Sequence, residues 1–222
     1  MNSDLGSLLW GGLLETLYMV FWAALFAIAI GMVLGVSIVV TDKGHIYESP
    51  KIHKVLGTLI NSVRSLPFII LVVILIPVAR LILGSTLGPT PAILSLSIGA
   101  APFLGRIIEN ALKEVDIGKI EAAQSVGASK WTIIFRVMLP EAFPALIRGI
   151  TIGLIGIVEF TAIAGAIGAG GLGSLAIRYG YQRFREDILI STVLLIIVLV
   201  QVIQFTGDRM ARSVDKRRNQ LG

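Results

Sequence analysis

An uncharged run of 24 residues, Leu17 to Val40, constrains the fold of this chain more than any other feature of its sequence. A helix that crosses the hydrocarbon core of a bilayer needs about 20 mostly apolar residues. The segment before the run carries Asp4 and Glu15 but no lysine or arginine. A secretory signal peptide has a basic flank and a shorter apolar core. The run therefore predicts a retained membrane-spanning helix.

Four further apolar blocks follow, and the overall composition agrees with them. Only 15% of the 222 residues are charged and 55% are apolar, whereas a soluble domain carries about 25% charged residues. The mean hydropathy is +0.86. This balance excludes a soluble enzyme, because a folded soluble chain keeps a polar surface. We expect an all-α membrane protein with five transmembrane helices, at about residues 14–40, 59–83, 91–112, 142–166 and 188–206. Pro67, Pro77 and Pro102 should kink their spans.

The distribution of basic residues between these spans predicts the orientation. With the N-terminus outside, the inner segments 41–57, 113–140 and 208–222 hold three, four and five lysines and arginines, against three in residues 167–187 outside. Cytoplasmic loops are enriched in these residues. We therefore expect an N-out/C-in topology, with residues 208–222 as a basic cytoplasmic tail. The net charge of +5 follows from this bias and does not indicate a nucleic-acid partner.

Residues 113–140, between the third and fourth spans, form the only long amphipathic stretch in the middle of the chain. They predict a helix-turn-helix: Gly127 can adopt the positive φ that ends the first helix, Ser129 can cap the second and Pro140 should end it. A single apolar stripe is expected on the second helix, formed by Trp131, Ile134, Phe135 and Met138. Such a unit can lie on the membrane surface, pack beneath its own bundle or dock on a partner.

Part of this segment resembles a known family. The order Glu121-Ala122-Ala123, then Gly127 six residues after the glutamate, then Val137 and Leu139-Pro140, resembles the cytoplasmic loop signature of type I ABC importer permeases. The resemblance implies that residues 113–140 dock in a groove of a separate ATP-hydrolysing subunit. The residues expected to couple to it are Glu121, Ala122, Ala123, Gly127, Ala128, Ser129 and Lys130.

Other motifs extend this resemblance to about residues 12–210. Arg64-Ser65-Leu66-Pro67-Phe68, Gly99-Ala100-Ala101-Pro102-Phe103, residues 165–173 and residues 203–208 look like those of methionine importer permeases. The resemblance implies a multi-pass bacterial inner-membrane protein that works with a second copy of itself, two ABC ATPase subunits and an extracytoplasmic methionine-binding protein or lipoprotein, among membrane lipid.

A transport subunit without catalysis of its own is the corresponding expectation. The chain contains no Gly-x-x-x-x-Gly-Lys-Ser/Thr sequence for ATP phosphates, so we expect no cofactor on it, with ATP and Mg²⁺ on the partner ATPase. Two alternatives stay open: an importer permease for another small amino acid or solute, and a secondary transporter or channel that works without ATP. The latter would need ionisable relays or internal repeats within its spans.

Glu159 is the sharpest candidate on the transport path, because a carboxylate inside a span is costly and usually functional. Either a basic residue of another span, such as Arg80 or Arg106, pairs with it, or it faces the path and meets the substrate ammonium or tunes the gate. Four apolar side chains could line an apolar path beside it, although core packing would look the same in sequence. These are Phe68, Ile69, Phe160 and Ile163.

Glycines are concentrated after the fourth span. Gly168, Gly170, Gly171 and Gly173 formally fit a dinucleotide-binding pattern, but a predicted transmembrane helix rather than a strand precedes them. We expect a turn at the outer mouth that shapes the gate or the binding-protein contact.

The pairs Gly31/Gly35 and Gly149/Gly153 are small-residue faces for close helix packing. The chain has no cysteine and only two histidines, so no metal site is expected.

Overall fold

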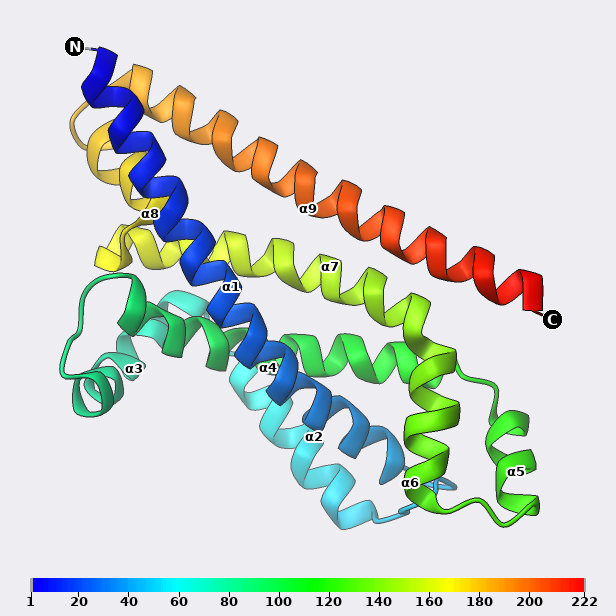
Figure 1. Ribbon diagram of the computed structural model, residues 1–222. Coiled ribbons are helices and arrows are strands. Elements are labelled where there is room, and N and C mark those ends of the chain that lie inside the picture. Colours follow the sequence, from blue (N-terminus) through cyan, green and yellow to red (C-terminus); the bar gives the residue numbers. More distant parts are fainter. Residues whose placement is uncertain (1, 222) are drawn as a thin grey trace.

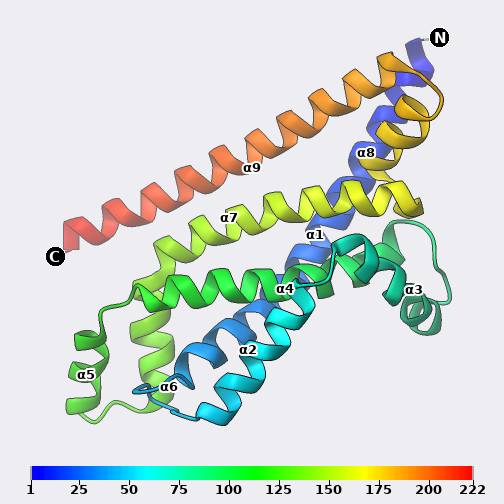
Figure 2. The same ribbon diagram turned by 180° about the vertical axis from the view of Figure 1, so that it is seen from behind.

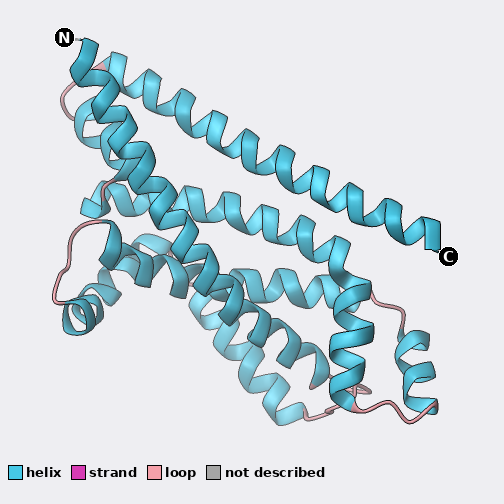
Figure 3. Cartoon of the chain, viewed as in Figure 1, coloured by secondary structure: helices cyan, strands magenta, loops and turns pink. Residues whose placement is uncertain are grey.

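The computed structural model describes the backbone of residues 2–221 and the side chains of residues 5–215. All the regular secondary structure of the described residues is helical, with loops and turns between the helices (Figure 1, Figure 3). The α-helices are α1 (Asn2–Val40), α2 (Pro50–Arg64), α3 (Phe68–Leu83), α4 (Pro89–Lys113), α5 (Ile117–Ser125), α6 (Lys130–Thr132), α7 (Leu139–Ala164), α8 (Gly171–Ser174) and α9 (Glu186–Leu221). Three π-helical segments join them: η1 (Ile133–Met138), η2 (Gly165–Ala169) and η3 (Leu175–Tyr181).

Four continuous helical stretches in the described residues are long and apolar enough to cross a membrane: Leu5–Val40, Pro89–Lys113, Lys130–Ala169 and Glu186–Asp215. The bent pair α2 and α3 supplies a fifth if it counts as one span. The all-α class is therefore confirmed, and four or five spans agree with the expected number.

The second predicted span is not one helix. Residues 59–83 lie partly in α2 and partly in α3, whose axes differ by 101° across Ser65–Pro67. Pro67 has no N–H for a helical hydrogen bond and disfavours helical geometry in the residue before it. The other two prolines act differently: α3 continues through Pro77 and α4 through Pro102. Of the three predicted kinks, therefore, Pro67 alone interrupts its helix.

The helix after Ser129 also differs from the expectation. Pro140 follows the π-helical η1, and Met138 and Leu139 before it keep helical backbone angles, so the helix runs on through the proline. Consequently α6, η1 and α7 form one continuous helical stretch from Lys130 to Ala164, which η2 extends to Ala169 with non-helical backbone angles at Ile167 and Gly168. The ribbon changes direction between α6 and α7 (Figure 1). The prediction that Pro140 ends the second short helix is wrong.

Helix α4 lies at the centre of the bundle, between α1 and α7 (Figure 2). Glycines allow both contacts. A Cβ on Gly35 of α1 would lie 2.8 Å from the Gly105 carbonyl oxygen and 2.7 Å from Ile108. On α7, a Cβ at Gly149 would overlap Ile107 and one at Gly153 would overlap Leu104. The predicted small-residue faces are thus confirmed as the surfaces that bring α1 and α7 against α4.

We predict that Gly35→Ala lowers stability by about 1–3 kcal/mol, because the added methyl group meets the backbone of α4 as well as a side chain. Gly11→Ala in the same helix is the matched control, since nothing lies within 4 Å of its added Cβ. Thermal unfolding of the detergent-solubilised protein measures both. Equal midpoints for the two variants would contradict the close-packing argument.

Candidate functional site

Residues 113–140 form a compact unit at one end of the bundle. Asp116 begins α5 by accepting a hydrogen bond from the Gly118 N–H at 2.8 Å. After α5, Gly127 has φ +78°, and Ser129 caps α6 by accepting from the Thr132 N–H at 3.2 Å. The predicted helix break and cap are both confirmed.

The coupling candidates in this unit face outward. Glu121, Ala122, Gly127, Ser129 and Lys130 are exposed, while Ala123 and Ala128 are half-buried. The half-buried pair closes the turn, because the Ala128 N–H donates to the Ala123 carbonyl at 3.0 Å. The structure therefore offers the Glu-Ala-Ala segment and the turn after it as an accessible surface.

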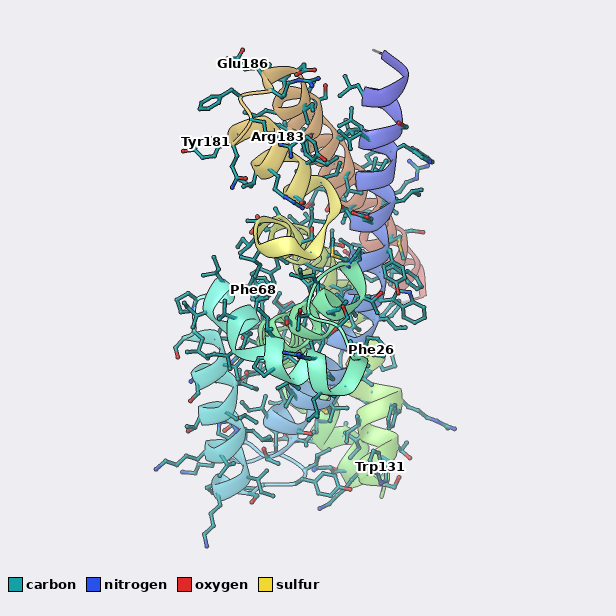
Figure 4. The ribbon with its side chains drawn as sticks, turned by 90° about the vertical axis from the view of Figure 1, so that its left-hand side faces the viewer. Phe26, Phe68, Trp131, Tyr181, Arg183 and Glu186 are labelled. Carbon is teal, nitrogen blue, oxygen red and sulfur yellow. The ribbon has the colours of Figure 1, made fainter. Side chains whose placement is uncertain are left out.

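The predicted apolar stripe of the second short helix is divided between two faces. Ile134 and Met138 are buried, at 4% and 0% exposure, whereas Trp131 and Phe135 are 64% and 57% exposed. The two exposed rings stack on each other, with centroids 5.8 Å apart. The single stripe was wrong because η1 is wound more widely than the α-helix that the spacing assumed. Figure 4 shows Trp131 at the lower end of the molecule.

A polar cluster connects this end of the bundle to α4 and to the loop between α1 and α2. Lys113 donates to Glu109 at 2.8 Å and lies 3.5 Å from Asp42, and Lys130 sits 4.2 Å above the Tyr47 ring. A hydrogen bond from the Lys43 N–H, at 2.8 Å, is the main cause that lowers the pKa of Asp42 below its usual value. Folding depresses this pKa, so ionised Asp42 stabilises the fold above about pH 4, and the contribution is lost as pH falls through the folded pKa.

The five path candidates lie around a contact between α3 and α7. Phe68 and Phe160 stack face to face, with centroids 4.2 Å apart and ring planes 9° apart. Both rings are half-buried, whereas Ile69 and Ile163 are 43% and 37% exposed and Glu159 is exposed. The structure thus brings Phe68 of α3 into contact with Phe160 of α7, some 90 positions away in the sequence. Phe68 lies at mid-height in Figure 4.

Glu159 makes no hydrogen bond or ion pair with any described residue. Arg106, one of its two possible partners, instead donates to Glu109 at 2.6 Å and to Asn61 at 2.9 Å. Arg80, the other, is exposed and pairs with no described side chain. Glu159 therefore has no structural partner among the described side chains.

The glycine-rich segment is a tight reversal of the chain between α7 and α8. Gly168, Gly170 and Gly171 have φ of +102°, +85° and +76°, a region that only glycine adopts without strain. At Gly173 a Cβ would overlap Ala162, so this position is small because α7 approaches it closely. The predicted turn is confirmed, and the dinucleotide pattern is not a nucleotide site because helices flank it on both sides.

Two residues of α1, absent from the predicted site, hold this turn. The Glu15 carboxylate accepts from the Gly171 N–H at 2.6 Å, and the Thr16 hydroxyl accepts from the Leu172 N–H at 2.8 Å. They satisfy the first backbone donors of α8, which has no capping side chain of its own. The signal in the sequence was a carboxylate two residues before the start of the uncharged run from Leu17 to Val40.

These features define a helical membrane protein with an exposed polar loop at one end, a glycine turn at the other and an aromatic contact between them. The chain belongs to the family described as binding-protein-dependent transport system inner membrane component, whose model matches residues 27–220. It is therefore a component of a membrane transport system rather than an enzyme.

Named relatives cover nearly the whole chain. The "Probable D-methionine transport system permease protein MetI" of Vibrio cholerae is 46% identical over 98% of this chain and 95% of the relative. The "Methionine import system permease protein MetP" of Bacillus subtilis is 45% identical over 97% of each. Among solved structures, a chain of the "MetNI methionine ABC transporter" in an inward-facing conformation matches with a TM-score of 0.95 and 42% identity, over 96% of this chain and 99% of that one.

We predict that Glu15→Gln lowers stability by about 1 kcal/mol, because a neutral amide oxygen interacts less well with the N-terminus of a helix than a carboxylate does. Glu15→Ala should lower it further, since the Gly171 N–H then loses its acceptor. Thermal unfolding in detergent should rank the native chain first, the glutamine variant second and the alanine variant third. An alanine variant as stable as the native chain would contradict the capping role.

Proposed function

We propose that this chain is the permease subunit of an ATP-driven ABC importer for methionine, in its D or L form. Relatives at 45–46% identity carry methionine transport in their names, and the aligned solved structure is a methionine ABC transporter. The observation that carries the proposal is the unit at residues 113–140. It presents the Glu-Ala-Ala segment outward on a support that continues as one helical stretch into a membrane span.

The proposed topology is N-out/C-in, in the inner membrane of a bacterium. The basic residues of 41–57, 113–140 and 208–222 support it. On this topology the glycine turn and residues 178–185 face outward, where an extracytoplasmic binding protein would deliver substrate. The side chains of Lys216, Arg217 and Arg218 lie outside the described residues.

The proposed partner at the inner end is a separate ATPase, with ATP and Mg²⁺ bound there. Closure of an ATPase dimer would draw two copies of residues 113–140 together. The continuous stretch from Lys130 to Ala169 would carry that motion into the membrane as one body. Exposed Glu121 and Lys130 would supply polar contacts, and the Trp131–Phe135 pair an aromatic anchor.

We further propose that two copies enclose the path. The described part of α9 is far less buried than the other spans, with 11% of its most apolar window buried, so it has apolar surface available for lipid or for a second copy. Exposed Glu159 beside Ile163 supports a path on the open α3–α7 face, because a lone carboxylate facing lipid would be costly. A secondary transporter would not need a docking surface at residues 113–140.

Purification under mild detergent tests the proposal. The tagged chain, expressed with the genes that neighbour its own, should bring an ABC ATPase with it at one copy per permease chain. In vesicles the complex should accumulate methionine only with ATP and a binding protein. A chain that never retains an ATPase but transports methionine along an ion gradient would identify the secondary-transporter alternative.

We predict that Trp131→Ala weakens ATPase binding about 10-fold or more without unfolding the chain, because the ring is exposed and stacks on the similarly exposed Phe135. Tyr181→Ala is the matched control: it removes a ring of 70% exposure from the opposite end of the molecule (Figure 4). Titration of solubilised permease with purified ATPase gives both affinities. Equal affinities for the two variants would show that the aromatic pair faces lipid instead.

A further inference from the structure

Two oppositely charged residues lie close in the sequence to the stacked rings, and neither pairs with anything in the described part of the chain. Arg64, the last residue of α2, is exposed, as is Glu159 on α7. Neither makes a hydrogen bond or ion pair with another described residue. Other charges near the middle of the chain do pair, for example Arg106 with Glu109 and Arg148 with Asp215. Solitary charges within a membrane protein call for a polar partner supplied from elsewhere.

Helical spacing places both charges next to the Phe68–Phe160 stack. Arg64 is seven residues after Gly57 and three after Asn61, and both of these meet Arg106 of α4. Residues at this spacing share one face of a helix, so Arg64 lies on the α4 side, one turn nearer the break at Pro67. Phe68 begins α3 directly after that break, and its ring lies against Gly99 of α4.

Glu159 reaches the same region from α7. Gly156, three residues before it, lies against Phe103 of α4, and Phe160, directly after it, stacks on Phe68. On its other side Glu159 borders an exposed apolar stripe formed with Ile152 and Ile163, which are 56% and 37% exposed. Helical spacing and these contacts therefore indicate a cation, an anion and an apolar surface around one pair of aromatic rings.

We propose that Arg64 and Glu159 clamp a zwitterionic α-amino acid, binding its carboxylate and its ammonium respectively, on either side of the Phe68–Phe160 pair. This inference rests on the proposed function and adds the residues that recognise the substrate. The guanidinium of arginine matches a carboxylate with two parallel hydrogen bonds. A carboxylate and neighbouring ring faces suit an ammonium. Ile69 and Ile163 then contact the apolar side chain of the substrate.

Both charged ends of the substrate must find partners in the site. Transfer of a zwitterion out of water without such partners is strongly unfavourable. A molecule with one of the two charges would leave either Arg64 or Glu159 without a partner. The clamp therefore selects the α-amino acid backbone, and the apolar surface selects the side chain.

The absence of cysteine from the chain permits a direct test. Ile163→Cys places a single reactive thiol four residues, or about one helical turn, after Glu159. The full chain in membrane vesicles, with its ATPase where that co-purifies, is treated with a neutral maleimide in the presence of increasing L-methionine. We expect methionine to slow the modification. Arg64→Gln and Glu159→Gln should each raise the methionine concentration that halves the modification rate by about 10-fold or more. Arg64→Lys should raise it less than Arg64→Gln does.

Matched controls remove equivalent charges elsewhere. Arg80→Gln removes another exposed, unpaired arginine of the same broken span, and Glu186→Gln removes an exposed carboxylate at the far end of the molecule (Figure 4). Both should leave protection within about twofold of the native value. L-methioninol lacks the carboxylate and 4-methylthiobutyrate lacks the ammonium, so neither should protect as methionine does.

Three results would overturn the clamp: no protection by methionine of a thiol that reacts readily, equal protection by the one-charge analogues, or equal shifts in the controls. ATPase retention, measured on the same preparations, separates this outcome from failure of the proposed function. An ATPase-bearing complex without protection rejects the clamp alone. Protection without any ATPase keeps the clamp and rejects the ABC importer.

Discussion

The close contact of α1 and α7 with α4 is the constraint on which the rest of the structure depends. Burial of apolar side chains supplies little driving force for helix association in lipid, because lipid tails are as apolar as leucine. Association therefore depends on backbones that approach closely enough for tight packing. Gly35 and Gly153 permit that approach on the two sides of α4. With α4 fixed between them, the polar end at residues 113–140 and the glycine turn occupy defined places at the two ends of the bundle.

The long stretch from Lys130 to Ala169 links those two ends. Its first turns carry the exposed Trp131–Phe135 pair, its middle carries Glu159 and its end enters the glycine turn that Glu15 of α1 caps. A displacement of residues 113–140 by a partner would therefore act on the path region without an intervening flexible loop. The broken span has the complementary role: the 101° bend at Pro67 places Phe68 against Phe160.

Much of the architecture followed from pattern. The uncharged run from Leu17 predicted α1, the glycine pairs predicted the close helix faces, and Gly127 and Ser129 predicted the break and cap before α6. The errors came from prolines and helix pitch. Pro140 was expected to end a helix, but the helix continues through it, and the π-helical η1 turned Trp131 and Phe135 away from Ile134 and Met138. The sequence does not distinguish a proline that ends a helix from one that a helix runs through, because the outcome depends on how the neighbouring helices pack.

The sequence by itself determined that this chain is a helical membrane component with a family-specific loop, because apolar length, charge asymmetry and the spacing of residues 121–140 are properties of the chain alone. Tertiary structure decided which charges find partners. Arg106 and Arg148 pair within the chain, Glu15 caps α8, and Arg64 and Glu159 are left beside an aromatic stack. Pairing depends on which helix faces meet, and that follows from packing between residues far apart in the sequence.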